Sequence, residues 1–403
     1  MVRESALGAG IAAAAIADTP HWDQALGRAL GEVGDTLTAQ PDLVLLFAAP
    51  AYAQMFSYMA AVTQERTGAA IVIGCSGQGV IGPGREVEER PALSVLAASL
   101  PGARLHAVHI SQATVAGDGT PEAWHALTGV DPEDVNAWLI FSDPFTIDTE
   151  ALLRGLARAY PGVPLIGGVA SGSMTERRTH LFLNGDVLTA GAVLLAIGGA
   201  YTVRTVVSQG AQPIGAPWTV TGAHENVLET IGGRPAYEVL VETFHTLAPE
   251  MQTRARANLL VGLAMDEYRD EFGRGDFLIR NLLGGDQQTG ALAISAYPRV
   301  GQTIQFQVRD ADAADEELRA MLVRERAELG ERRPVAALLC ACNGRGLGLF
   351  GAPDHDARTL AEELGPVPVA GFFCNGEIGP VGGTAFLHGF TASIALIVPV
   401  EGG

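Results

Sequence analysis

A chain of 403 residues is too long for one ordinary hydrophobic core, so its length favours two or three domains. Hydrophobic residues make up 48% of the chain and charged residues 18%, which excludes a disordered protein and favours a well-buried globular one. A net charge of −19 argues against nucleic acid and anionic membrane as main partners. An acidic small molecule stays compatible, because local charge decides its binding.

The first expected element is the apolar stretch 8–17, which follows Glu4 and lacks the basic segment and cleavage pattern of a secretory signal. We interpret it as a first strand or the edge of a helix. No apolar run reaches 18 residues, so we expect no membrane span and a cytoplasmic protein. Apolar residues at helical spacing predict the helices of the chain. The expected helices are 20–38, 52–67, 121–128, 149–159, 235–246, 313–331 and 356–364.

Continuous apolar runs between these helices predict buried strands, which favours α/β layering. The runs are 70–74, 163–168 and 367–373. The turn-rich stretch 208–215 marks a change of composition, so we predict one domain over 1–205 and a second over 206–403. Within the second domain, short alternating segments predict hairpin strands at 277–280, 291–294 and 303–308.

Three parts of the chain share one order of elements: a strand, a helix, a second strand, a small-residue loop and a third strand. They cover 43–98, 137–196 and 336–397, with the loops Cys75-Ser76-Gly77, Ala170-Ser171-Gly172 and Cys374-Asn375-Gly376. The loop glycine lies 15 residues before the third strand in the first and last copies and 18 in the middle one, which indicates a small insertion there. Such self-similarity suggests one reused unit. Three equivalent loops at strand ends are then natural walls of one ligand site.

The predicted fold class is therefore α/β and two-lobed, with repeated strand–helix–strand units, mixed β-sheets and flanking helices. Layering in the order α-β-β-α is one arrangement that fits.

The window 371–380 is the richest in chemistry, because a small polar loop leaving a buried strand exposes backbone N–H groups to a ligand. In it Cys374 offers a soft wall, Asn375 a donor and an acceptor, and Glu377 a base or a partner for an amine. The alternative is structural: a buried cysteine beside a glutamate that caps a turn.

A second window contains Cys342, Asn343 and Arg345 in the sequence Cys-Asn-Gly-Arg-Gly. Flanking glycines leave the guanidinium of Arg345 free to grip a carboxylate or phosphate, although the lysine and serine or threonine of a P-loop are missing. The structural alternative is a salt bridge. Arg309, at the end of an amphipathic strand, either shares a cleft with Arg345 or pairs with Asp310 or a helix.

Few histidines and cysteines are candidates for a metal, haem or proton-transfer site. His388 lies among apolar residues and is either a satisfied core histidine or the best candidate for a proton relay or a haem ligand. Four cysteines in a chain of this length do not indicate a disulfide framework, and the spacing of Cys340 and Cys342 does not favour a zinc site. We therefore expect no metal.

Taken together, these windows resemble the FIST family, whose paired N-terminal and C-terminal ligand-sensing domains occur in prokaryotic signalling proteins and in a eukaryotic F-box protein. The resemblance covers most of residues 40–400. Cys75 and Ser76, in the first of the three small-residue loops, also count among the candidate ligand-binding residues. The resemblance rests on the motifs at 73–82, 85–88, 208–210, 213–215, 275–281, 305–310, 342–346, 371–383 and 388–391.

The resemblance implies a sensory module that binds a small ligand, with amino acids or related metabolites proposed for the family. Our leading hypothesis is a cytoplasmic, non-catalytic sensor without a cofactor, since no nucleophile–base set stands out. It passes its signal to a separate protein partner, because FIST-like sequence fills the chain. The oligomeric state stays open. One alternative is a haem-binding nitric-oxide sensor that uses His388, and another is a hydrolase or lyase that uses Cys374 and Glu377.

Overall fold

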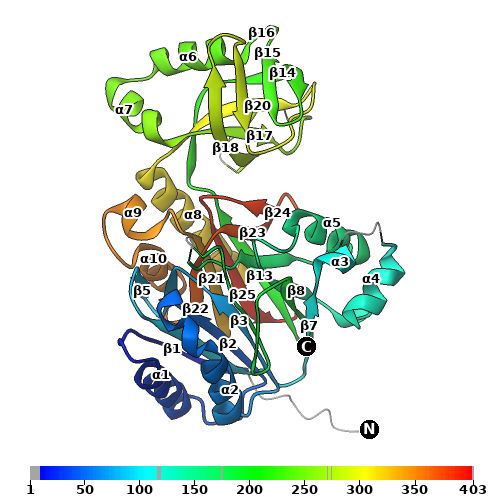
Figure 1. Cartoon of the computed structure of the whole chain (residues 1–403), viewed down its shortest axis with the longest axis vertical. Coiled ribbons are helices and arrows are strands. Elements are labelled where there is room, and N and C mark those ends of the chain that lie inside the picture. The colour runs from blue at the N-terminus through cyan, green and yellow to red at the C-terminus, as the bar shows by residue number, and fades with distance from the viewer. Residues whose placement is uncertain (1–9, 116–118, 174–175, 270, 274, 402–403) are drawn as a thin grey trace. The chain divides into compact units, whose positions relative to one another are not determined.

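The chain folds into two compact units in the computed structural model, which describes residues 10–115, 119–173, 176–269, 271–273 and 275–401 (Figure 1). The small unit is Ser208–Leu318, and the large unit combines Met1–Val207 with Arg319–Gly403. These units do not follow the chain order of the predicted domains 1–205 and 206–403. The C-terminal part returns to the large unit because its strands pair with N-terminal ones, as Phe372 does with Val80.

The large unit contains three six-stranded mixed sheets. The first is, in spatial order, β1 (Ile11–Ala17), β6 (Leu93–Ser99), β2 (Leu43–Ala48), β3 (Ile71–Ser76), β10 (Leu181–Leu183) and β11 (Asp186–Leu188). The second is β24 (Thr384–His388), β23 (Gly376–Val381), β9 (Leu165–Val169), β8 (Ala137–Ser142), β12 (Ala192–Gly199) and β7 (Ala103–Ile110). The third is β13 (Tyr201–Ser208), β25 (Ala392–Pro399), β21 (Ala336–Cys342), β22 (Val369–Cys374), β4 (Gly79–Gly82) and β5 (Arg85–Glu88).

Each sheet of the large unit is built on the same three central strands. Two parallel strands are joined through a helix, and an antiparallel strand lies beside the first of them: β2, β3 and β6; β8, β9 and β12; β21, β22 and β25. These are the strands of the three predicted copies. The α/β class with strand–helix–strand units and mixed sheets is thus confirmed, while their origin from one reused sequence unit stays a prediction.

A glycine occupies the same place in the second strand of each parallel pair. Gly74 lies opposite Leu46, Gly167 opposite Ile140 and Gly371 opposite Leu339. A Cβ at these positions would lie 1.8, 2.0 and 1.9 Å from the carbonyl oxygen of the opposite residue. No side chain fits at such a close backbone approach, so the strand pairing itself requires glycine.

One hydrophobic core is shared by the three sheets. At its centre the rings of Phe47, Phe141 and Phe372, one from each sheet, pack with centroids 5.0 to 5.9 Å apart. Gly168 leaves the room that the Phe372 ring needs, since a Cβ there would lie 3.0 Å from it. Aromatic residues supply the largest buried apolar area per side chain, so this trio ties the sheets together.

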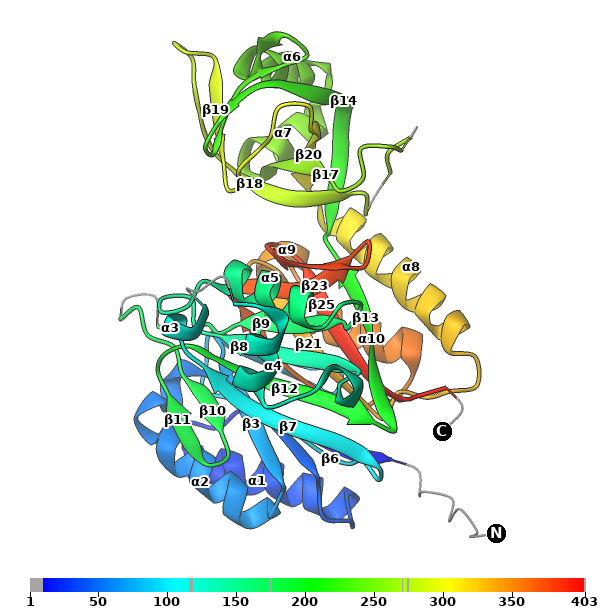
Figure 2. The same ribbon diagram turned by 90° about the vertical axis from the view of Figure 1, so that its right-hand side faces the viewer.

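Helices cover the outer faces of these sheets (Figure 2). Their apolar stripes face the sheets, as in α5, where Leu152 and Leu156 are buried and the Asp148 side chain accepts the first-turn N–H of Ala151. The helices are α1 (Trp22–Thr36), η1 (Pro50–Met55), α2 (Phe56–Thr67), α3 (Gln112–Val115), α4 (Pro121–Thr128), η2 (Pro132–Asp134), α5 (Thr149–Ala159), α8 (Ala311–Leu329), α9 (Gly346–Phe350) and α10 (His355–Leu364). The helices predicted from spacing are all confirmed, with small differences at their ends.

The small unit is a seven-stranded sheet whose ends meet, because β14 also pairs with β15. Its strands are β14 (Ala211–His224), β20 (Thr303–Arg309), β17 (Leu259–Ala264), β18 (Phe277–Asp286), β19 (Ala291–Ile294), β15 (Val227–Ile231) and β16 (Arg234–Pro235). The predicted hairpin strands correspond to β18, β19 and β20. Together with α6 (Ala236–Thr246) and α7 (Pro249–Asn258), the sheet encloses its own apolar core.

Candidate functional site

The three predicted small-residue loops meet in the large unit. The Ser76 hydroxyl donates to the Ser171 carbonyl over 2.8 Å, and the Ser171 N–H donates to the Ser76 carbonyl over 3.1 Å. Asn375 joins them by donating its backbone N–H to Val169 and its side-chain amide to Ala170, over 3.0 and 3.1 Å. The loops after β3, β9 and β22 therefore form one hydrogen-bonded junction at the ends of these strands.

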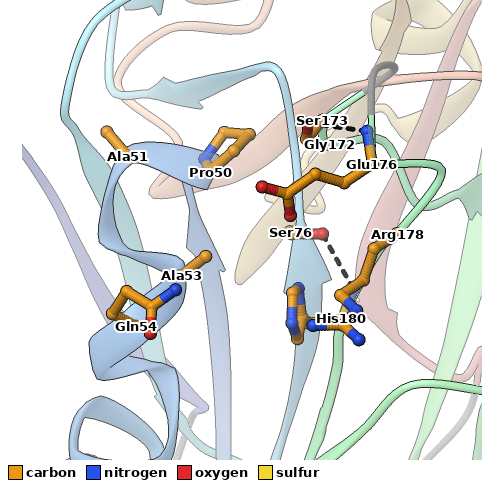
Figure 3. A pocket seen from close by; sticks show the side chains of 10 residues that line it. All are labelled: Pro50, Ala51, Ala53, Gln54, Ser76, Gly172, Ser173, Glu176, Arg178 and His180. Atoms are coloured by element: carbon orange, nitrogen blue, oxygen red, sulfur yellow. Dashed lines mark hydrogen bonds between the residues drawn. The ribbon is translucent and has the colours of Figure 1, made fainter.

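A pocket of about 330 Å³ opens beside this junction, between η1 and the loop that connects β9 to β10 (Figure 3). Polar side chains from both segments face it, together with Ser76 at the end of β3. Its lining residues are Pro50, Ala51, Ala53, Gln54, Ser76, Gly172, Ser173, Glu176, Arg178 and His180. Among the predicted site residues, Ser76 is the one that lines this pocket.

Charges of both signs line the pocket. Glu176 extends its carboxylate toward the space between η1 and Ser76 (Figure 3), and the exposed Arg178 has no salt-bridge partner among the described residues. Burial lowers the pKa of His180 below its ordinary value, and the charge of Arg178 lowers it further, so the imidazole is neutral at pH 7. The pocket thus offers one cation, one anion and a neutral imidazole.

The hydroxyl of Ser76 is already engaged in holding the pocket wall. Besides donating to Ser171, it accepts the backbone N–H of His180 over 3.0 Å, and it is 1% exposed. A serine nucleophile needs an adjacent base, and here the partners of the hydroxyl are backbone groups. Ser76 therefore shapes the site rather than activating a substrate.

Cys374 and Glu377, the residues of the enzyme alternative, lie side by side in the interior. The Cys374 thiol donates to the Ala341 carbonyl and to Glu377 Oε1, over 3.2 and 3.3 Å, and Glu377 Oε2 accepts the Thr391 N–H over 2.9 Å. Both side chains are fully buried. Burial raises the pKa of the Cys374 thiol well above its ordinary value, and the Glu377 carboxyl raises it further. Neither a thiolate nor an open approach for substrate is available, so this geometry does not favour a cysteine nucleophile.

Alkylation of the native protein should separate the four cysteines. We expect iodoacetamide to modify the half-buried Cys342 first, and Cys75, Cys340 and Cys374 at least about 100-fold more slowly, because burial raises the pKa of these three thiols. Peptide mass spectrometry gives the rates, with denatured protein as the control in which all four react. Fast labelling of Cys374 in the native protein would restore the enzyme alternative.

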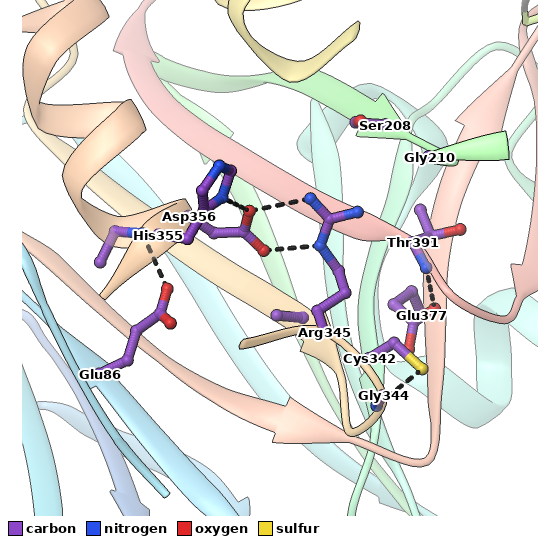
Figure 4. Close-up of polar contacts among 12 residues, drawn as sticks. Glu86, Ser208, Gly210, Cys342, Gly344, Arg345, His355, Asp356, Glu377 and Thr391 are labelled. Atoms are coloured by element: carbon purple, nitrogen blue, oxygen red, sulfur yellow. Dashed lines mark hydrogen bonds and ion pairs between the residues drawn. The ribbon is translucent and has the colours of Figure 1, made fainter. Parts of the chain in front are cut away.

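Arg345 is fully buried and forms a bidentate ion pair with Asp356 (Figure 4). Its Nε donates to Asp356 Oδ2 over 2.6 Å and its Nη2 to Oδ1 over 2.8 Å, and His355 Nδ1 lies 2.9 Å from the same Oδ1. Burial by itself would raise the pKa of Asp356, but the Arg345 guanidinium holds it well below its ordinary value. The structural alternative for Arg345, a salt bridge, is the one that this geometry shows.

Cys342 and Asn343 lie at the end of β21, beside the loop junction. The Asn343 N–H donates to the Cys374 carbonyl over 3.0 Å, and its side-chain amide donates to Asn375 Oδ1 over 2.8 Å. The Cys342 sulfur accepts the Gly344 N–H over 3.4 Å. These residues extend the junction rather than the pocket. Asn375 is the exposed member of the group.

Arg309 and Arg345 belong to different compact units. Arg309 ends β20 opposite Ala211, and the neighbouring Asp310 forms an ion pair with Arg254. Cys75, the remaining candidate, is fully buried in the core below the junction.

His388 does not fit a haem ligand as it stands. Its Nε2, a nitrogen that iron would use, lies 2.9 Å from the Gly379 carbonyl oxygen, and its side chain is 4% exposed within the hairpin of β23 and β24. Among the residues that the structure describes, no cluster of three histidine, cysteine or acidic side chains could hold a metal ion.

Glu176, Arg178 and His180 were not identified from the sequence. The available signal was the middle copy, where the glycine of the loop lies 18 residues before the third strand instead of 15. The charged run Glu176-Arg177-Arg178 occupies this longer connection. A charged insertion beside a strand-end loop is a feature that sequence reasoning can use.

Three mixed sheets around one core, and a second compact unit that lies in the chain between β13 and β21, define a two-unit α/β protein. The chain belongs to the FIST family: the FIST N domain matches residues 42–234 and the FIST C domain matches residues 236–380. FIST domains are associated with sensing and signalling. No helix among the described residues is long and apolar enough to cross a membrane.

Two similar proteins come from mycobacteria. The uncharacterized protein Rv0628c of Mycobacterium tuberculosis (strain ATCC 25618 / H37Rv) is 40% identical over 397 residues, which cover 97% of this chain and 99% of the relative. The uncharacterized protein Mb0898c of Mycobacterium bovis (strain ATCC BAA-935 / AF2122/97) is 38% identical over 386 residues, 95% of this chain and 97% of the relative. A cyanuric acid hydrolase from A. caulinodans matches 98% of this chain and 100% of its own, at 11% identity and a TM-score of 0.37.

Proposed function

We propose that this protein is a cytoplasmic, non-catalytic sensor that binds a small metabolite carrying a carboxylate and an amino group, such as an amino acid. The observation that carries the proposal is the pocket of about 330 Å³ lined by Arg178 and Glu176. Ligand pockets span roughly 300 to 1,000 Å³, so a site of this size suits a metabolite rather than a large cofactor.

The polar groups of the pocket suit the two ends of such a ligand. An arginine guanidinium pairs with a carboxylate through charge-assisted hydrogen bonds, and Glu176 supplies an anion for an ammonium group. The neutral imidazole of His180 and the amide of Gln54 add uncharged donors and acceptors. The hydrogen bonds of Ser76 hold the wall in place before the ligand arrives, which lowers the cost of ordering the site.

The signal itself would pass to another protein. The FIST N and FIST C matches together cover 42–234 and 236–380, and FIST domains are associated with signalling. A net charge of −19 disfavours nucleic acid and anionic membrane as the receiver. We therefore propose a protein partner that distinguishes the liganded from the free form.

Replacing Arg178 by alanine should weaken binding of a carboxylate ligand at least about tenfold, because a charge-assisted hydrogen bond contributes about 1.5–3 kcal/mol. A thermal-shift screen of the proteinogenic amino acids and small dicarboxylates supplies the probe, and calorimetry then gives the dissociation constants. The matched control is Arg177→Ala, which removes the neighbouring charge but leaves the pocket lining intact, and should change affinity less than about threefold. Equal loss in both variants, or none in Arg178→Ala, would remove this pocket from the binding site.

A further inference from the structure

Glu86 is a buried acid that the proposed ligand site does not use. It lies on β5, the edge strand of its sheet, and is 5% exposed. Its Oε1 accepts the N–H of Ala357, in the first turn of α10, over 2.9 Å (Figure 4). Its Oε2 is buried and has no hydrogen-bond partner among the described residues. A buried carboxylate with an unsatisfied oxygen is costly, whereas a protonated carboxyl carries no charge to desolvate.

The strand that carries Glu86 is fastened to the segment 345–357 by further polar contacts. The Glu86 N–H donates to Asp354 Oδ1 over 2.7 Å, and the Leu347 N–H donates to Glu88 Oε1 over 2.9 Å. Glu88 also covers Gly346, where a Cβ would lie 2.4 Å from its carboxylate oxygen. We name residues 85–88 together with 345–357 the β5 latch.

Among the residues that the structure describes, the charges that face Glu86 leave no counter-ion for it. Arg345 already holds Asp356 through two hydrogen bonds. The other neighbouring groups are the carboxylates of Glu88 and Asp354, the latter beside Arg358, and the imidazole of His355, which contacts Asp356. An ionised Glu86 would thus add a second buried negative charge near Asp356, with the one guanidinium of Arg345 already paired to Asp356. Such like-charge pairs do not both ionise readily at neutral pH.

We propose that the β5 latch is a pH-controlled contact, closed while Glu86 holds its proton and released when Glu86 ionises. Burial raises the pKa of Glu86 from 4.5 to about 8, and the charge of Asp356 contributes to this. The direction of the pH effect on latch opening follows from the difference in the pKa of Glu86 between the closed and open forms. Below pH 4.5 the open and closed forms both hold the proton; between pH 4.5 and 8 only the open form loses it, so opening becomes easier by up to about tenfold per pH unit. Above pH 8 both forms ionise and the effect levels off.

Hydrogen–deuterium exchange of the full chain tests the latch without a ligand. After correction for the chemical exchange rate, peptides covering 345–357 should exchange about 50-fold faster at pH 8 than at pH 6, and no more than about twofold faster still at pH 9. Peptides of β2 in the shared core should change far less. The variant Glu86→Gln keeps the shape of the protonated acid without its titration, so its latch peptides should show no pH dependence.

The control variant is Glu89→Gln, which removes an exposed carboxylate just after the same strand and leaves every latch residue in place, so it should keep the pH response. A flat response in the unmodified protein would overturn the latch, and so would an equal response in Glu86→Gln. If Glu86→Gln does not fold, the unmodified protein still decides: the rise between pH 6 and 8 followed by a plateau supports the latch, and any other profile contradicts it.

Discussion

Replacing Arg345 by alanine is expected to destabilise the protein by about 3–5 kcal/mol, because it leaves Asp356 buried without its counter-ion. Asp356 is 1% exposed, so water cannot replace the guanidinium at low cost. Urea unfolding at pH 7 measures the loss. The penalty should shrink toward pH 5, since without Arg345 burial raises the pKa of Asp356 and lets the carboxyl take up a proton.

The matched control is Arg28→Ala, which breaks an exposed ion pair with Glu32 one helical turn away on α1. Exposed pairs of this kind contribute about 0.3–0.5 kcal/mol, so the two arginine variants should differ several-fold. A loss below about 1 kcal/mol for Arg345→Ala would mean that the guanidinium is not committed to Asp356. Arg345 would then return as a ligand-binding candidate.

Arg345 also shows where sequence reasoning stops. Two flanking glycines indicate an arginine with open space around it, and both a ligand contact and a salt bridge fit that pattern. Which of these two roles Arg345 has depends on the position of Asp356. The turn before α10 brings Asp356 back toward Arg345. Local sequence predicts the elements on either side of this turn but not its path, so the partner could not be named.

The helices and strands could be predicted from the sequence because the patterns that indicate them involve residues close together in the chain. Apolar periodicity fixed α4 and α5 to the residue, and continuous apolar runs located the parallel strands. The return of residues 319–403 to the large unit depends on pairing between β4 and β22, almost 300 residues apart, and no local pattern encodes such a partner choice.

The site was harder to predict than the fold. Small residues surround four of the predicted site residues: Cys75, Arg345, Cys374 and Glu377. The neighbours of these residues are small because the segments are tightly packed in the interior, and not because they line a ligand site. The exposed charges of Glu176 and Arg178 lie in a connecting loop, where charged residues are ordinary and attract no attention. Ser76 was predicted because strand-end loops were singled out, and it lies where the packed junction meets the open pocket; its part in ligand binding stays a prediction.

Substituting alanine for Gly371 should destabilise the large unit by about 3 kcal/mol or more. The added Cβ would lie 1.9 Å from the Leu339 carbonyl oxygen and 2.8 Å from its carbonyl carbon. These are backbone atoms of β21, which is held between β22 and β25, so no side-chain rotation relieves the overlap. Thermal and urea unfolding of the full chain measure the loss.

The matched control is Gly31→Ala on α1, where an added Cβ meets nothing within 4 Å. This variant should instead stabilise the protein by about 0.5–1 kcal/mol, because glycine in a helix interior costs that much relative to alanine. Opposite signs for the same chemical change would show that close strand approach, and not glycine content, is what the parallel pairs require. If Gly371→Ala were as stable as the parent protein, the β21–β22 pairing would have to be looser than described. The same geometry at Gly74 and Gly167 predicts the same direction of change in the other two sheets.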